Sequence, residues 1–245
     1  MDAYGDCPRL GAGTLDLLGR VTTATLSMQL LRRGLRRVSM AGPRPLDSAH
    51  ARFVGEAFTL SFLPLREDLA TLESYQQPGA LREAIEAMPP GRVAVIDARG
   101  DTGCGTLGDI LLLRMCQLGV VAAVSDGAVR DVRGCRAVGL PVFCAGFAAP
   151  ASIGGLVFAG WEQPIGCGGV TVLPGDVVVG DEDGVVAIPR YLADEVAEAG
   201  EEQERFERFV IHRVGQNEPL VGLYPPDEAT LAAYRAWLDA GEPEA

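Results

Sequence analysis

The chain has 245 residues, of which 48% are hydrophobic and 22% charged, and its 33 acidic side chains outnumber 21 basic ones for a net charge of −12. Every basic residue is Arg, because the sequence contains no Lys. Schiff-base aldolases, pyridoxal-phosphate enzymes and P-loop nucleotide hydrolases each need a Lys amine, so these three classes are excluded. The acidic balance argues against nucleic-acid binding through bulk charge, which requires a basic face.

Charge is spread unevenly along the chain. Residues 1–60 carry 8 Arg against 5 acids, whereas residues 191–245 carry 4 Arg against 13 acids. The acidic excess near the C-terminus is more typical of a solvated helix face than of an interaction tail. Near the N-terminus four arginines form a small basic cluster, Arg32, Arg33, Arg36 and Arg37. That cluster could bind RNA or an acidic subunit tail, and the acidic C-terminal segment favours the second partner.

The sequence lacks the patterns of secretion and of a membrane span. Residues 1–10 have no basic region followed by an apolar run, and no stretch approaches the roughly 18 apolar residues of a spanning helix. The six Cys form no C-x-x-C pair, so we expect buried thiols in a reducing cytoplasm rather than disulfides or a zinc site. With only His50 and His212 available, any metal would be held largely by carboxylates, which favour Mg²⁺ or Mn²⁺.

The first part of the chain predicts two helices and two strands. Leu26, Leu30 and Leu31 recur at helical spacing over residues 22–33, where Thr hydroxyls can cap the start and Gly34 can end the helix. Strands are expected over residues 36–40 and 55–62, the second from its alternating pattern. A further helix opens at Pro78-Gly79 and ends at Met88, before Pro89, Pro90 and Gly91.

From residue 93 strands and helices alternate at short intervals, which is typical of an α/β fold with a parallel sheet. The expected strands are 93–98, 120–124 and 141–145, and the expected helices are 107–118 and 131–138. After Pro150 the pattern changes to an antiparallel meander of strands 156–161, 169–173, 177–179 and 185–188. Helices follow over 189–213 and 227–238, joined by a loop; we expect both to pack on a partner subunit or on the main domain.

A literal G-x-G-x-x-G occupies residues 103–108, and Asp126 lies where a ribose-binding acid could fall. A dinucleotide site is nevertheless disfavoured. Residues 99–102 separate the motif from its strand, a substantial domain precedes it, and no second mononucleotide half follows. The same glycines could form a cradle for a substrate carboxylate at a helix N-terminus, or serve only tight packing.

Charged side chains follow two neighbouring strands of the predicted parallel sheet. Asp109 opens the helix after the Gly-rich segment, and Arg130-Asp131 follows strand 120–124. Because ligands bind beyond the carboxyl ends of such strands, two carboxylates and one guanidinium should converge on one rim. Asp131 could hold a hard cation, Arg130 a carboxylate or enolate oxygen, and Asp109 a water. The alternative is an Arg capped by Asp neighbours in a structural turn.

The spacing of these residues resembles the D-x20-R-D signature of the RraA-like family. That family contains class II 4-hydroxy-4-methyl-2-oxoglutarate aldolases, oxaloacetate decarboxylases and regulators of ribonuclease E activity. The resemblance continues in order over roughly residues 20–210, through Pro90-Gly91, Gly108-Asp109, residues 126–131 (DGAVRD), residues 139–143 (GLPVF), residues 168–170 (GGV), residues 174–176 (PGD) and residues 180–185 (GDEDGV).

The resemblance implies a fold and an assembly. The fold would be α/β, a compact α/β/β sandwich of the swivelling-domain type with C-terminal helices. The assembly would be a homotrimer or homohexamer, with active sites between subunits. Residues 1–20 would be an N-terminal extension, 21–213 the catalytic domain and 214–245 a C-terminal helical extension.

The resemblance also implies residue roles. Asp131 would ligate Mg²⁺ or Mn²⁺, with waters in most other positions. Arg130 and the segment Gly108, Asp109, Ile110 and Leu111 would hold the pyruvyl group of a small 2-oxo acid, and Asp109 would act on the water that shuttles the methyl proton. The implied reaction is retro-aldol cleavage of a 4-hydroxy-2-oxo acid or decarboxylation of oxaloacetate, through a pyruvate enolate.

The sequence departs from the family in the half of the site that recognises the rest of the substrate. Where aldolase members place a Lys, the region around residues 153–156 offers only Ser152 and glycines, and Ser27-Met28-Gln29 and Ala149-Pro150 replace the usual residues. Two alternatives therefore stay open: a non-catalytic ribonuclease-regulating binding protein, and a pathway-specific lyase or isomerase. A neighbouring subunit could complete the metal's outer shell through Glu201, Glu202 or Glu204. Residues 181–184 (DEDG) predict a tight hairpin rather than a calcium loop.

Overall fold

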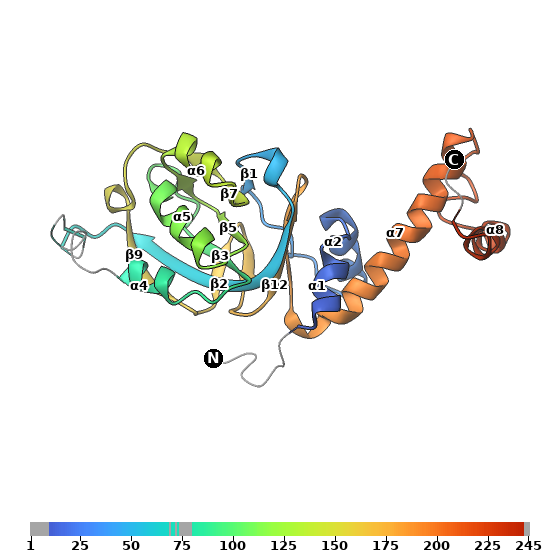
Figure 1. Ribbon diagram of the computed structural model, residues 1–245, viewed down its shortest axis with the longest axis horizontal. Helices are drawn as coiled ribbons and strands as arrows, with labels where there is room; N and C mark the ends of the chain where they lie inside the picture. Colours follow the sequence, from blue (N-terminus) through green and yellow to red (C-terminus); the bar gives the residue numbers. More distant parts are fainter. Residues whose placement is uncertain (1–9, 69, 72, 74–79, 243–245) are drawn as a thin grey trace.

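The computed structural model describes residues 10–68, 70, 71, 73 and 80–242. It contains an α/β body from which one long helix, α7, projects and carries α8 at its far end (Figure 1). The helices are α1 (Ala12–Leu18), α2 (Thr23–Arg32), η1 (Ser48–His50), α4 (Ala80–Glu86), α5 (Asp109–Gln117), α6 (Val132–Val138), η2 (Ser152–Gly154), η3 (Arg190–Leu192), α7 (Ala193–Gly215) and α8 (Glu228–Asp239). Among these described helices, none combines the length and apolarity needed to cross a bilayer.

The strands belong to three sheets. The main sheet has the order β1-β7-β5-β3-β2-β12-β13, with β9 also paired to β2. Its strands are β1 (Arg44–Pro45), β2 (Phe53–Pro64), β3 (Arg92–Asp97), β5 (Ala122–Ser125), β7 (Val142–Cys144), β9 (Leu156–Trp161), β12 (Val177–Asp181) and β13 (Gly184–Ile188). The two smaller sheets are β4 (Gly105–Leu107), β6 (Ala128–Val129) and β8 (Gly146–Phe147), and the hairpin of β10 (Ile165–Cys167) and β11 (Val170–Val172).

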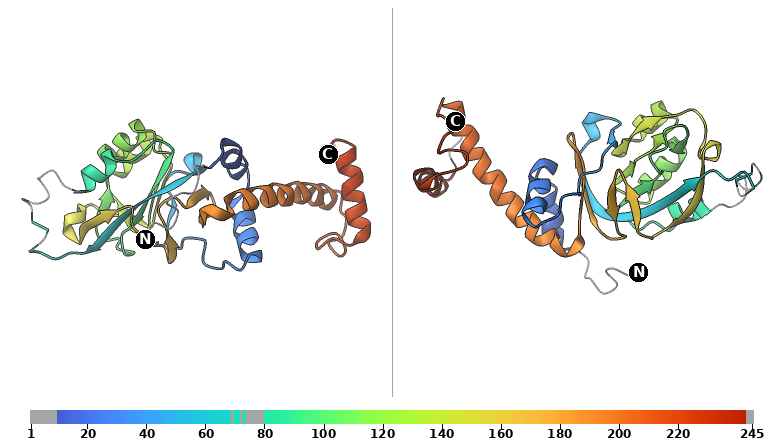
Figure 2. Two further views of the ribbon diagram at one scale, coloured as in Figure 1. Left: turned by 90° about the horizontal axis from the view of Figure 1, so that it is seen from below. Right: turned by 180° about the vertical axis from the view of Figure 1, so that it is seen from behind.

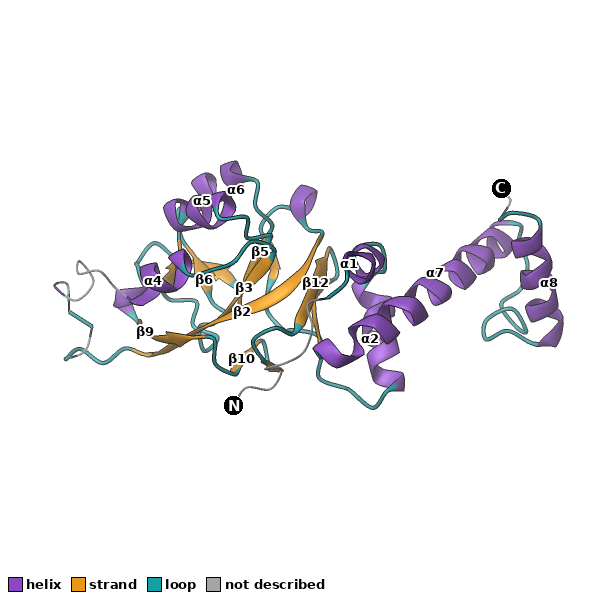
Figure 3. Cartoon of the chain, turned by 60° about the horizontal axis from the view of Figure 1, so that its bottom comes forward, coloured by secondary structure: helices purple, strands orange, loops and turns teal. Residues whose placement is uncertain are grey.

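The centre of the main sheet is parallel, as the alternation of strands and helices predicts. Strands β2, β3, β5 and β7 pair in parallel. Along β3 the side chains alternate between two cores: Ala94 and Ile96 face the layer of α4, α5 and α6, whereas Val93 and Val95 face the β10–β11 hairpin. Figure 3 shows the three helices on one face of the sheet and β10 on the other. The expected α/β/β sandwich is therefore confirmed.

Two of the strand predictions are wrong. The stretch after residue 150 is not one meander, because β9 and β12 pair with different halves of β2 while β10 and β11 form their own hairpin. β2 reaches both partners because it runs to 12 residues, longer than the predicted strand 55–62. Residues 36–40 form no strand: Ser39 makes an isolated bridge to Val186 on the outer side of β13.

The helix predictions hold closely, apart from helix α1, which the sequence analysis missed. Helix α2 begins after Thr22, whose hydroxyl accepts the Thr25 N–H at 3.2 Å, and Gly34 follows its end at a φ of +87°. The predicted helix 78–88 is observed as α4; Pro78 and Gly79 lie outside the described residues. Tail helix α7 starts at Ala193 rather than Pro189, because η3 comes first.

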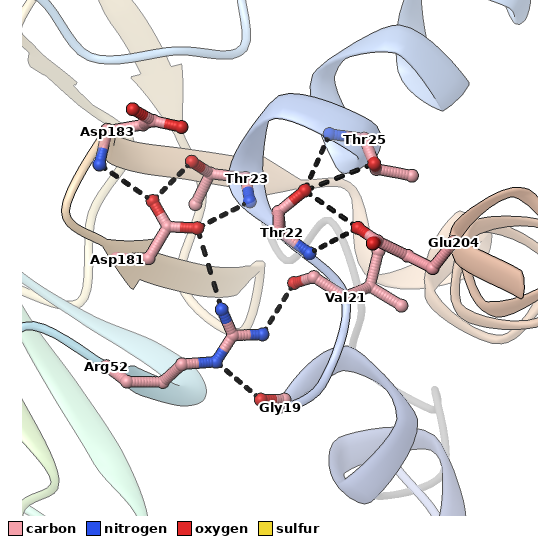
Figure 4. A network of polar contacts seen from close by, with 9 residues as sticks. All are labelled: Gly19, Val21, Thr22, Thr23, Thr25, Arg52, Asp181, Asp183 and Glu204. Carbon is pink, nitrogen blue, oxygen red and sulfur yellow. Dashed lines mark hydrogen bonds and ion pairs between the residues drawn. The ribbon is translucent and has the colours of Figure 1, made fainter. Parts of the chain in front are cut away.

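A buried polar network fixes α2 to the sheet (Figure 4). Asp181, at the end of β12, accepts the Thr23 N–H at 2.7 Å and the Thr23 hydroxyl at 2.6 Å, and Arg52 lies 3.6 Å from its carboxylate. Asp181 also accepts the Asp183 N–H at 3.0 Å, inside the tight β12–β13 turn. Residues 181–184 thus form the expected hairpin, with an acid that anchors a helix.

A second carboxylate of the network, Glu204 of α7, accepts the Thr22 N–H at 3.0 Å and its hydroxyl at 2.8 Å. These bonds fix the first part of α7 beside α1 and α2, and Figure 2 shows the rest of the helix leaving the body. At its far end Phe209 and Tyr234 join α7 to α8, with ring centroids 5.5 Å apart. The first part of α7 therefore packs on the body, as expected, whereas α8 packs on the far end of α7.

Candidate functional site

The six residues that the sequence analysis assigned to the site line one cavity of about 430 Å³: Gly108, Asp109, Ile110, Leu111, Arg130 and Asp131. They come from two turns that follow paired strands. β4 leads into α5 and β6 leads into α6, and these strands pair in parallel beyond the carboxyl ends of β3 and β5. The expected convergence of two carboxylates and one guanidinium on one rim is therefore what the structure contains.

The Gly-rich segment differs from a nucleotide-binding turn. Residues 105–107 form strand β4, and Gly108 precedes helix α5 in an extended conformation. Asp126 is buried outside the cavity, where it accepts the Ala98 N–H at 2.7 Å and the Gly168 N–H at 3.3 Å. The Asp126 carboxylate thus accepts hydrogen bonds from backbone N–H groups instead of facing the cavity, where a ribose would need it. This agrees with disfavouring a dinucleotide site.

Asp109 is the first residue of α5 and lies against α6. Its carboxylate accepts the Ile110 N–H at 2.8 Å, one of the donors that a helix start leaves without an intrahelical partner. A Cβ at Gly134 in α6 would collide with this carboxylate, so the glycine lets the two helices approach. The sequence analysis missed Gly134, although a glycine inside a helix costs about 1 kcal/mol relative to Ala and is itself a signal.

Arg130 and Asp131 form an open pair at the mouth of the cavity. Asp131 adopts a left-handed backbone conformation, with a φ of +54°, directly before α6. The Arg130 Nε lies 3.1 Å from the Asp131 Oδ2, and the two side chains are 37% and 45% exposed. A Cβ at Gly108 would lie 2.8 Å from the same Oδ2, so only glycine leaves room for the carboxylate there. Strained backbone of this kind is concentrated at functional sites.

Cys135 of α6 stabilises the turn that contains Arg130 and Asp131. The sequence analysis did not single out this residue. Its thiol donates to the Arg130 carbonyl oxygen at 3.0 Å. Burial raises the pKa of the Cys135 thiol to about 11, and the charges of Asp109 and Asp131 add to the effect. The thiol therefore stays protonated, and serves as a donor that holds the Arg130–Asp131 backbone. Cys104, Cys144 and Cys167 are also buried, as expected, but Cys116 is exposed.

The donor set at Asp131 fits a hard divalent cation. In the described part of the chain no three His, Cys, Asp or Glu side chains gather in a metal-binding group. A cation at Asp131 would therefore take one protein carboxylate and complete its shell with water and substrate oxygens, the habit of Mg²⁺ and Mn²⁺. A closed site of several nitrogen or sulfur ligands does not fit, since no such group of side chains gathers among the described residues.

The far side of the cavity is apolar. It is lined by Phe62 of β2, Leu81 of α4, Ile153 of η2, and Leu156 and Phe158 of β9. The Phe62 and Phe158 rings meet edge to face, with centroids 5.3 Å apart. Of the described residues on this side, Ser152 and Arg82 have polar side chains, and Arg82 already has an interaction within the molecule. The cavity therefore joins a charged end to an apolar one.

Of the three acids considered for a neighbouring subunit, two have partners in their own chain. Glu204 binds Thr22, and Glu202 accepts the Tyr234 hydroxyl at 3.1 Å. Glu201 is half-buried on α7, and no partner for it is found within the described residues. In the basic cluster, Arg33 pairs with Glu195 at 2.9 Å.

Comparison with known proteins identifies the same family that the sequence resembles. The family model described as RraA-like, Aldolase/RraA, matches residues 23–187. A Halalkalibacterium halodurans protein named "Putative 4-hydroxy-4-methyl-2-oxoglutarate aldolase" is 39% identical over 129 residues, which are 51% of this chain and 59% of that protein. The chain thus covers little more than half the length of this relative.

Two solved structures resemble most of the chain. Streptomyces coelicolor RraAS2, described as an unusual member of the RNase ES inhibitor RraA protein family, has a TM-score of 0.74 and 35% identity, covering 82% of this chain and 97% of its own. An uncharacterized Pseudomonas syringae protein has a TM-score of 0.78 and 26% identity, covering 89% and 95%. From the family model over residues 23–187 and these likenesses, the chain belongs to the RraA-like family.

Proposed function

We propose that this protein is a divalent-metal-dependent lyase that cleaves a C–C bond of a 2-oxo acid and releases pyruvate. The observation that carries the proposal is the convergence of Asp109, Arg130 and Asp131 on one cavity, over the backbone of Gly108. The aldolase name of the Halalkalibacterium relative supports the same class of reaction. Retro-aldol cleavage of a 4-hydroxy-2-oxo acid and decarboxylation of oxaloacetate both break the bond between C3 and C4.

Each site residue has a role in this scheme. The Arg130 guanidinium binds the substrate's carboxylate and 2-oxo oxygen through its planar fork, and stabilises the negative charge that develops on that oxygen. Asp131 holds the Mg²⁺ or Mn²⁺ ion, which when bound would supply further positive charge for the same oxygen. Asp109 orients a water that returns a proton to C3, so that the enolate leaves as pyruvate.

The proton and electron count closes without a further reactant. In the retro-aldol direction the 4-hydroxyl passes its proton to the water held by Asp109, C4 becomes a carbonyl, and the C3–C4 electron pair moves to C3. In the decarboxylation the same electron pair moves to C3 and CO₂ leaves. In both cases C3 takes one proton from that water, and we assign the control of this transfer to Asp109, which lines the cavity.

The test is pyruvate release by the purified protein from oxaloacetate and a panel of 4-hydroxy-2-oxo acids. We expect release with Mg²⁺ or Mn²⁺, loss of release with a chelator, and restoration when the metal is returned. Asp131→Ala should abolish release with either metal. If no acid of the panel yields pyruvate, the lyase proposal is wrong.

The likeness to RraAS2 over 97% of that chain favours one second candidate, a ribonuclease-regulating binding protein. We would measure RNA cleavage by a ribonuclease E-type enzyme with and without this protein. Inhibition that persists in Asp131→Ala, in a protein that releases no pyruvate, would support the regulator. Inhibition that is absent, together with metal-dependent pyruvate release, would support the lyase.

We also propose a homotrimer or homohexamer with active sites between subunits. Apolar side chains next to the cavity are left exposed, Ile110 at 78% and Phe147 at 58%, and association of copies would bury them. Glu201 is the acid that we assign to a neighbouring metal shell, because Glu202 and Glu204 have partners in their own chain. Light scattering on the intact protein tests the assembly, and a monomer at micromolar concentration would contradict it.

A further inference from the structure

Resting on the lyase function proposed above, we propose that this protein selects 2-oxo acids whose leaving fragment is uncharged and apolar, of branched-aliphatic or aromatic size, over dicarboxylic ones. The observation behind this inference is the division of the cavity. Arg130 and Asp131 come from the turn after β6, whereas the described apolar lining comes from other elements, β2, α4, η2 and β9. The charged end suits the pyruvyl group, so the fragment beyond C4 is directed at the apolar wall.

The wall is built from the hydrophobic core. Phe62 and Leu156 are buried, and Phe158 stands between Phe62 and Trp161, with centroids 5.3 and 6.4 Å from theirs. Leu81 and Ile153, both half-buried, complete the surface that faces the cavity. The five side chains that face the cavity have no polar atoms to turn toward a ligand. The wall therefore offers dispersion contacts and aromatic ring faces.

Among the described residues, a carboxylate on the leaving fragment would have few partners on this side. Burying an ionised group without a hydrogen-bonded or charged partner costs several kcal/mol, whereas an apolar group gains from leaving water. The chain has no Lys to supply a counter-charge. Among the described residues Arg82 is the second cation that lines the cavity, but it is exposed and already has an interaction in the molecule.

The cavity has room for such a fragment. Its volume of about 430 Å³ lies within the usual range for small-ligand sites, and pyruvate alone would leave most of it empty. An apolar leaving group would fill the space between the C4 atom and the Phe62–Phe158 pair. Filling apolar space in this way changes kcat/KM by roughly 10- to 200-fold for each methylene-sized contact.

The experiment compares three substrates with the same pyruvyl half. With Mg²⁺ present, the intact protein is given 4-hydroxy-2-oxo-4-phenylbutanoate, 4-hydroxy-2-oxo-6-methylheptanoate and 4-hydroxy-2-oxoglutarate, which release benzaldehyde, 3-methylbutanal and glyoxylate beside pyruvate. We expect kcat/KM for at least one of the two apolar substrates to exceed that for the dicarboxylate by about tenfold or more. A dicarboxylate that is cleaved as fast or faster overturns the inference and leaves the lyase function standing. No pyruvate from any of the three overturns both.

A charge-insertion variant gives a second, independent readout. Ile153→Lys places an ammonium in the wall, and should raise kcat/KM for the dicarboxylate by about tenfold relative to the apolar substrates. Val221→Lys is the matched control, since Val221 is 95% exposed and does not line the cavity. A substrate ratio that is the same in both variants would show that the wall does not contact the leaving fragment, and would overturn the inference.

Discussion

Two aspartates, Asp131 and Asp181, both lie at or just after the end of a strand, but one is open to solvent and the other is buried. Asp131 follows strand β6 and Asp181 ends strand β12, and each lies near an arginine. The Asp181 side chain is 3% exposed and accepts three hydrogen bonds from Thr23 and Asp183, whereas Asp131 is 45% exposed and pairs with Arg130. A carboxylate whose acceptor sites are used internally stabilises the fold, while one with open sites can bind a ligand.

Replacing Asp131 should separate activity from stability. Asp131→Asn keeps the size and the tolerance of a left-handed backbone but removes the charge, so we expect kcat/KM for pyruvate release to fall by about a thousandfold, roughly 4 kcal/mol. Surface substitutions change stability little, so Tm should move by less than about 2 °C. Steady-state kinetics and thermal melts check the two halves. A large loss of Tm would place Asp131 with the structural carboxylates.

Replacing Asp181 should give the reverse result. Asp181→Asn weakens a buried charged acceptor and leaves the Arg52 guanidinium without its counter-charge, so we expect a loss of about 3 kcal/mol in the free energy of unfolding. For a chain of this size that corresponds to a Tm lower by roughly 6–12 °C. At 15 °C, where the variant stays folded, kcat/KM should match the wild type. A catalytic defect in the folded variant would contradict the comparison.

Gly134→Ala tests whether site geometry depends on the contact between α5 and α6. The added Cβ would collide with the Asp109 carboxylate and push it from its place. Displacements of about 1 Å in a catalytic group can cost a hundredfold in rate, so we expect kcat to fall by 10- to 100-fold while Tm changes modestly. Gly13→Ala in α1 is the control, because a Cβ there meets no neighbouring atom within 4 Å. Equal rates in both variants would remove Asp109 from the mechanism.

The smallest expected effect concerns Glu204 and acid stability. Burial raises the pKa of the Glu204 carboxyl, but the hydrogen bonds from Thr22 and Thr25 outweigh it and hold the pKa below its usual value. A carboxyl with a lowered folded pKa contributes stability above its unfolded pKa, and loses it as the pH falls through the folded one. The Tm difference between wild type and Glu204→Gln should therefore shrink as the pH is lowered from about 6 to 3. A difference that is constant over this range would contradict the assignment.

The sequence predicts those parts of the fold that depend on local patterns. Thr22 and Gly34 mark the ends of α2 because capping and left-handed termination act within one turn. The parallel strands follow from short alternating segments, and the spacing of Asp109, Arg130 and Asp131 places them shortly after paired strands. For these elements, spacing along the chain is close to proximity in space.

The remaining features depend on contacts that have no local signature. The pairing of β9 and β12 with opposite ends of β2 cannot be read from their own residues, which suit a meander equally well. The close approach of Gly134 to Asp109 and the bond from Cys135 to the Arg130 backbone depend on how α5 and α6 pack. The apolar wall likewise brings together β2, α4, η2 and β9.

Helix α7 connects the α/β body to α8 across a long distance. Its 23 residues span about 35 Å, and Gly200 in its first half lies so close to Val21 that a Cβ there would be 2.8 Å from the valine's Cγ1. The first half of α7 is therefore held at the body, and its far end carries α8 through an aromatic cluster. Because a straight helix transmits rotation without bending much, a tilt of about 10° at Gly200 would sweep α8 through several ångströms. A change in packing around Val21 that tilted α7 would therefore move α8 farther than it moved the start of the helix.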